Sequence, residues 1–151
     1  MSGPELPEVT IGEPANGRDC ISISTYRWED YQQRDHGPES GILVSLGVYT
    51  SGVFYHARGR FIARSEFVHF RRDIEGMLDG QAETAAISAV GNAFSFRLSR
   101  DNRKFAAIGS IVDARSGEEE HFAIGALYTE HLATAAKSLQ VVLDWFDLPK
   151  T

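Results

Sequence analysis

The chain has 151 residues, of which 42% are hydrophobic and 24% are charged, the ordinary composition of one globular domain. Its formal net charge of −6 argues against non-specific binding to the phosphate backbone of nucleic acids. There is no run of roughly 18 apolar residues and no basic, apolar leader, so we expect no membrane contact and a cytoplasmic location. The single cysteine, Cys20, excludes an intrachain disulfide and fits a small buried residue at the start of a strand.

The chain begins with a segment that contains three of its five prolines, Pro4, Pro7 and Pro14. Proline and weak periodicity favour an extended or flexible N-terminal arm over residues 1–19. Residues 20–148 are then expected to form a single domain. Within it, residues 20–26 alternate in the period of a strand, whereas the polar segment 27–41 is typical of a loop.

A hairpin follows, with strands at 42–49 and 53–62 joined by a turn that contains Gly52. Helical spacing predicts helices over 65–80 and 129–146, and strand alternation is found in four further segments: 83–90, 93–99, 104–114 and 119–128. Short turns between consecutive strands require antiparallel pairing. The sequence therefore predicts an α+β domain with a mostly antiparallel sheet of about seven strands, in the order β-β-β-α-β-β-β-β-α, and two helices packed on one face. No internal repeat is visible.

The segment SEFVHFRRDIEGMLDGQA brings a histidine close to arginines and acids, which raises the question of a reactive cluster. Its apolar residues instead form one helical stripe, and Gly80 is suited to end the helix. His69 with Asp73, and Arg71 with Glu75, are spaced as i, i+4 pairs on the wet face. The charges are therefore interpreted as those of a surface helix.

No motif in the sequence predicts a catalytic centre, a metal site or a cofactor. The five histidines do not form HxH, HxxxH or HExxH, and no nucleophile elbow or phosphate-binding glycine loop is present. Glu119 and His121 share a strand face beside other acids, but the GEEEHF stretch is better explained as a solvated turn and strand start. We therefore expect a protein that is not an enzyme.

A polar sheet face is the strongest indication of a binding surface. Strand alternation in 53–62 places Phe54, His56, Arg58, Arg60 and Ile62 on one face, and a second polar set includes Arg97. Exposed tryptophan, tyrosine and arginine are the residue types that anchor protein interfaces. The candidate partner-binding residues are His56, Arg58, Arg60, Arg97, and Trp28 and Tyr31 from the loop.

Two stretches resemble the WapI-like family of small bacterial immunity proteins and its uncharacterised relatives. They are YTSGVFYHARGRF, a hairpin that feeds a helix ending in LDG and followed by QAETAAIS, and FSFRLSRDNRKFAAIGSIVDARSGEEEHFAIGALYTEHL, which leads into the final helix. The resemblance covers roughly residues 42–146 and departs from the family pattern at Tyr128–His131. It implies a non-enzymatic protein that neutralises a cognate toxin, and it carries no catalytic residues across.

The sequence therefore favours a non-enzymatic cytoplasmic protein that binds a protein partner, with a toxin domain as the partner that the resemblance implies. The acidic charge would favour a basic toxin through electrostatic steering. The alternative is a small-ligand-binding or sensor module with a pocket between sheet and helices. Open sheet edges also leave a homodimer as an alternative.

Overall fold

The computed structural model describes residues 8–13, 19–25 and 41–146. Its first half runs through four strands and a helix: β1 (Glu8–Gly12), β2 (Cys20–Thr25), β3 (Gly41–Thr50), β4 (Val53–Ala63) and α2 (Arg64–Leu78). The second half repeats this order with a short 3-10 turn inserted: β5 (Thr84–Ser88), η2 (Val90–Asn92), β6 (Phe94–Asp101), β7 (Lys104–Val112), β8 (Glu119–Leu127) and α3 (Thr129–Phe146). Each half is therefore a unit of four strands followed by a helix.

The strands form two four-stranded antiparallel sheets, β1-β2-β3-β4 (sheet A) and β5-β6-β7-β8 (sheet B). The predicted α+β class with antiparallel pairing is confirmed, and the described residues contain eight strands, close to the seven expected. The additional strand, β1, lies in the segment predicted as an N-terminal arm, and Val9 and Ile11 pair with Ile23 and Ile21 of β2. Pairing stops at α2, so the strands on its two sides belong to different sheets.

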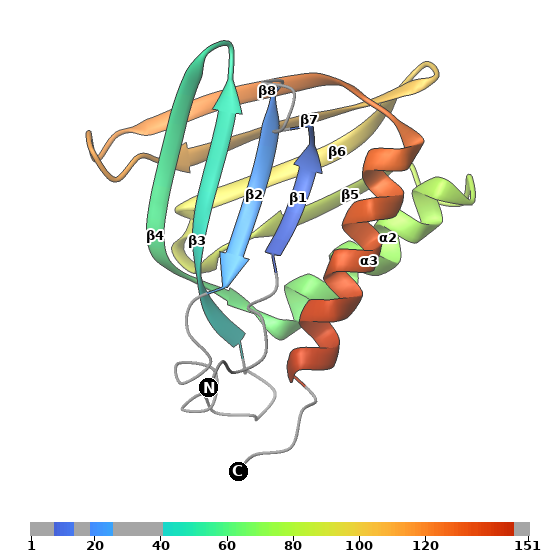
Figure 1. The fold of residues 1–151 in the computed structure, drawn as a ribbon, viewed down its shortest axis with the longest axis horizontal. Helices are drawn as coiled ribbons and strands as arrows, with labels where there is room; N and C mark the ends of the chain where they lie inside the picture. The colour runs from blue at the N-terminus through green and yellow to red at the C-terminus, as the bar shows by residue number, and fades with distance from the viewer. Residues whose placement is uncertain (1–7, 14–18, 26–40, 147–151) are drawn as a thin grey trace.

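The two sheets face each other across one core, and their strands cross steeply in Figure 1. The helices pack against each other at the open side, where α3 contacts edge strand β1 and α2 contacts edge strand β5. The helix of each half thus covers the edge of the other half's sheet. This differs from the predicted layer of helices on one sheet face, because the second sheet occupies the inner face of the first.

The apolar residues that recur at helical spacing are buried, as the sequence predicts. The α2 residues Phe67, Phe70, Ile74 and Met77 are fully buried, and the ring of Phe70 meets Phe96 of β6 edge-on at 5.4 Å. The Arg71–Glu75 pair forms at 3.1 Å. None of the described helices is long and apolar enough to cross a membrane.

Candidate functional site

The candidate residues His56 and Arg58 lie on β4, the strand at one edge of sheet A. Phe54, His56 and Arg58 are spaced by two, so their side chains project from the same outer face, and Tyr49 of β3 stands directly opposite Phe54. Phe54 and Arg58 are exposed, whereas Tyr49 and His56 are half-buried. We call this set, Tyr49, Phe54, His56 and Arg58, the aromatic patch.

Arg60 does not join the patch, although simple alternation placed it there. The register shifts from Leu46 opposite Ala57 to Val44 opposite Arg60, so Arg58 and Gly59 together oppose one residue of β3. This is a β-bulge, and Gly59 supplies its left-handed backbone with φ of +67°. Arg60 therefore shares the inward face of the buried Val44, and its Nε is buried without a hydrogen-bond partner among the described residues.

The Phe54 ring is the most exposed aromatic group of the patch, with 49% of the residue accessible to solvent. It stacks with the His56 ring at a centroid distance of 5.9 Å and an interplanar angle of 20°. It also lies over Gly47, where a Cβ atom would come within 3.1 Å of the ring. Glycine at position 47 thus makes room for a phenylalanine that lies flat on the sheet.

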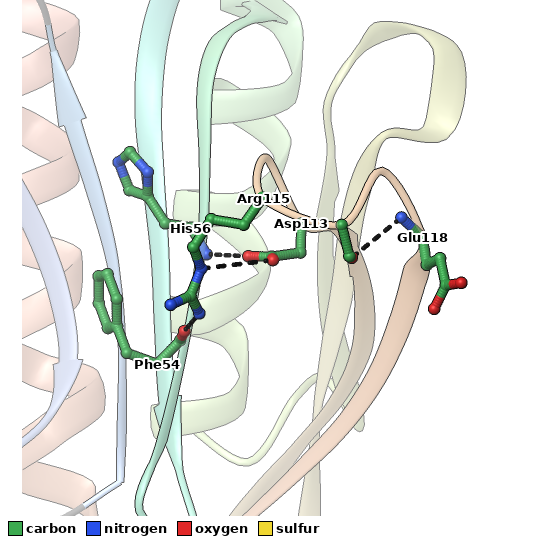
Figure 2. A network of polar contacts seen from close by, with 6 residues as sticks. Phe54, His56, Asp113, Arg115 and Glu118 are labelled. Carbon is green, nitrogen blue, oxygen red and sulfur yellow. Dashed lines mark hydrogen bonds and ion pairs between the residues drawn. The ribbon is translucent and has the colours of Figure 1, made fainter.

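The turn between β7 and β8 fixes the backbone beneath these rings (Figure 2). The His56 N–H donates to Asp113 Oδ1 at 3.0 Å, and the Ala114 N–H donates to the His56 carbonyl at 2.8 Å. Arg115 donates from Nη2 to the Phe54 carbonyl at 2.8 Å, while its Nε lies 3.6 Å from Asp113 Oδ2. Since β4 pairs only with β3, this turn covers its free edge. In Figure 2 the rings of Phe54 and His56 point away from the turn.

The Asp113 carboxylate is the charged centre of this turn. Its pKa lies below the ordinary value, chiefly because the His56 backbone N–H stabilises the ionised form. Burial opposes this shift and the nearby Arg115 guanidinium supports it. The carboxylate is therefore ionised at neutral pH and holds two segments that are 57 residues apart in the sequence.

The other candidate residues lie elsewhere. Arg97 projects from the outer face of sheet B, where it is exposed and opposes the exposed Ile108. The two sheets pack through their inner faces (Figure 1). Arg97 and the aromatic patch project from the outer faces of different sheets, so they lie on opposite sides of the molecule. Trp28 and Tyr31 fall outside the described residues. Among the described candidates, Arg97 therefore does not share a surface with His56 and Arg58.

A second feature, which sequence reasoning missed, is a hollow of about 250 Å³ between the ends of β1 and β8 and the start of α3. It is lined by Glu13, Asp19 and His131 together with Gly125 and Ala126. Ala126 adopts φ of +56°, a conformation that costs a non-glycine residue energy. His131 and Glu13 are 118 residues apart, so no local pattern could have associated them.

The hydrogen bonds of His131 decide what this hollow can do. Its Nδ1 accepts the Tyr128 backbone N–H at 2.9 Å, so in the neutral ring Nε2 carries the proton and donates to Glu13 at 2.9 Å. Glu13, Glu130 and His131 present ligand atoms within 4.8 Å of one another, a spacing open to a metal ion. However, Nε2 would first have to lose its proton, and Nδ1 is already occupied. His131 thus anchors the start of α3 and offers no free lone pair for a metal or a base.

Cys20 is buried at the start of β2, as its position predicted. Burial raises the pKa of its thiol, and the charges of Asp19 and Glu8 raise it further. Cys20 is therefore a packing residue and a poor nucleophile.

Comparison with protein-family models, curated proteins and solved structures gave no match to this chain.

Proposed function

We propose that the protein is a non-enzymatic binding protein that contacts a protein partner through the aromatic patch. The observation that carries this proposal is the Phe54 ring, half exposed yet fixed by its stack with His56 and by the Arg115 bond to its carbonyl. Aromatic and arginine side chains dominate the binding energy of protein interfaces. A ring that is already held in place loses little conformational entropy on binding, which supports its use as an anchor.

The finer proposal is that the partner is a toxin domain and that binding neutralises it. It is supported by the sequence resemblance to immunity proteins and by the net charge of −6, which would speed the approach of a basic partner. Edge-to-edge homodimerisation through β4 is less favoured, because the Asp113 turn already occupies the backbone groups of Phe54 and His56 on that edge.

The test is co-expression with candidate toxin domains, those encoded by neighbouring genes first, followed by measurement of the affinity of the purified pair. We expect the unchanged protein to rescue growth, and Phe54→Ala to weaken binding about thirtyfold, the effect of removing an interface anchor worth about 2 kcal/mol. Val141→Ala is the matched control, because Val141 is a similarly exposed apolar residue on α3.

Arg58→Glu tests the charged end of the patch in the same assay. Arg60→Glu is unsuitable there, because Arg60 points inward and its replacement would disturb folding. If both Phe54→Ala and Arg58→Glu bind as tightly as the unchanged protein, the patch is not the interface. If the unchanged protein fails to rescue, the neutralising function is wrong.

A small-ligand-binding or sensor function is a second candidate, favoured by the hollow beside His131. The carboxylates of Glu13 and Asp19 suit a small cationic ligand such as an amine. A rise in melting temperature with small amines would support this function. Gly125→Phe should abolish the rise by obstructing the hollow, because Gly125 lines it and an added Cβ there meets no atom within 4 Å. A rise that persists in this variant would contradict it.

A further inference from the structure

A groove lies on the other side of the molecule from the aromatic patch. It is an open groove of about 550 Å³ between α2 and the outer face of sheet B. Its floor is made by the small residues Ala86, Ser88 and Ser95, which let another backbone approach the sheet closely. Glu66 and His69 of α2 line one side, and Arg97 and Ile108 line the other. The groove is therefore built by two layers of the fold, with α2 standing beside edge strand β5.

The acid in this groove is already engaged. Glu66 Oε1 accepts the Ser88 backbone N–H at 2.9 Å and the Ser88 hydroxyl at 3.3 Å. The Ser88 N–H lies in edge strand β5, so the Glu66 carboxylate takes the place of a neighbouring strand. These bonds orient the Glu66 carboxylate toward the strand end, and within the described residues Glu66 forms no ion pair with Arg97.

The basic groups of the groove have no such partner. Within the described part of the chain, neither the Arg97 nor the His69 side chain forms a hydrogen bond or an ion pair, and both residues are exposed. The predicted His69–Asp73 pair does not form, and Asp73 contacts Arg72 at 3.5 Å. An acidic protein thus keeps an uncompensated guanidinium and an imidazole at one groove.

An apolar side chain stands beside this positive charge. Ile108 is 61% exposed at the middle of strand β7, directly opposite Arg97 on β6. A single exposed aliphatic residue needs no explanation of its own, but its position opposite Arg97 gives the groove an apolar contact beside a charged one.

We propose that this groove binds an extended acidic peptide segment, with a carboxylate on Arg97 and an apolar side chain against Ile108. The guanidinium fork matches the two oxygens of a carboxylate. A carboxylate is preferred to a phosphate because phosphate recognition uses clusters of arginines, and Arg97 is the single arginine that lines the groove. This site is independent of the proposed function, since it lies on the opposite sheet.

The test is a nuclear magnetic resonance titration of the full chain with the peptide Gly-Glu-Leu-Asp-Leu-Glu-Gly. We expect the amide signals of Ser88, Ser95 and Ile108 to shift in a saturable manner. Two control peptides separate the contacts: one has lysine in place of the acids, and one has serine in place of the leucines. Both controls should bind at least tenfold more weakly.

Arg97→Gln should weaken the acidic peptide about tenfold, the loss expected for one charge-assisted contact, and higher salt should weaken it further. Arg103→Gln removes the same charge from an exposed turn outside the groove and should leave the affinity unchanged. Ile108→Ser provides a second, uncharged test of the same site. The proposal is overturned if the groove signals do not move at millimolar peptide, if the lysine peptide binds equally well, or if Arg97→Gln has no effect.

Discussion

Gly109→Ala tests how the two sheets and α2 fit together. Gly109 lies on the inner face of β7, directly opposite Phe96. An added Cβ would lie 2.5 Å from the Phe96 Cβ and 2.7 Å from its Cα, and it would also meet the Ser95 carbonyl oxygen. These atoms belong mainly to backbone, so they cannot rotate away. The methyl group would push β6 outward and disturb the edge-on contacts of Phe96 with Phe70 and Phe94.

Overpacking of this kind costs about 1–3 kcal/mol, while replacing glycine by alanine returns about 0.4–1 kcal/mol through the unfolded chain. We therefore expect a net loss of about 1–2 kcal/mol, which corresponds to a melting temperature lower by roughly 2–8 °C for a domain of this size. Urea and thermal unfolding can be followed by tryptophan fluorescence, to which the buried Trp145 contributes. Gly125→Ala on β8 is the matched control, since its Cβ would meet open space. Equal stability of Gly109→Ala and the unchanged protein would refute the reasoning.

Three further predictions concern single side chains. Because the folded pKa of Asp113 is lowered, its charge stabilises the fold above the ordinary aspartate pKa of about 4, and this contribution is lost as the pH falls through the folded pKa. Asp113→Asn should thus lower the urea midpoint at pH 7, and its difference from the unchanged protein should shrink as the pH falls below the ordinary aspartate pKa; a constant difference down to the lowest pH would contradict this. Cys20 should react slowly with a thiol reagent at pH 8 until urea unfolds the chain, and rapid native labelling would show that it is accessible. Glu66→Ala should lower the free energy of unfolding, measured in urea, by about 1 kcal/mol, because it leaves the Ser88 N–H without its partner. Glu66→Gln should retain most of the stability, because its amide oxygen can still accept this hydrogen bond. If both variants lose the same amount, the stabilisation comes from the charge of Glu66 and not from the hydrogen bond.

Local periodicity was sufficient for most of the elements. The strand alternation at 104–114 and 119–128 and the helical stripe at 129–146 correspond closely to β7, β8 and α3. Each of these segments is long enough for its period to be distinguished. By contrast, β1 has only five residues between prolines, so its two inward residues, Val9 and Ile11, were too few to reveal it.

The candidate site was predictable only in part. The alternation correctly placed His56 and Arg58 together, because regular strand geometry holds up to that point. The alternation was wrong at Arg60, because the bulge at Gly59 shifts the strand register by one residue. A glycine within a strand does not reveal a bulge until the pairing with the neighbouring strand is known. The hydrogen bond from the His56 N–H to Asp113 and the contact between His131 and Glu13 each join segments far apart in the sequence. No local spacing of residues could have predicted either contact.

The sequence by itself determined which segments are strands and helices and which face of each is apolar, since both properties depend on residues close together along the chain. Tertiary structure decided that the strands form two sheets and that each helix crosses to the edge of the other half's sheet. The physical reason is that apolar faces are not specific for one another. The apolar stripe of either helix could have covered either sheet. Which sheet edge each helix covers is decided only when the eight strands and the helices α2 and α3 of the described residues pack together into one core.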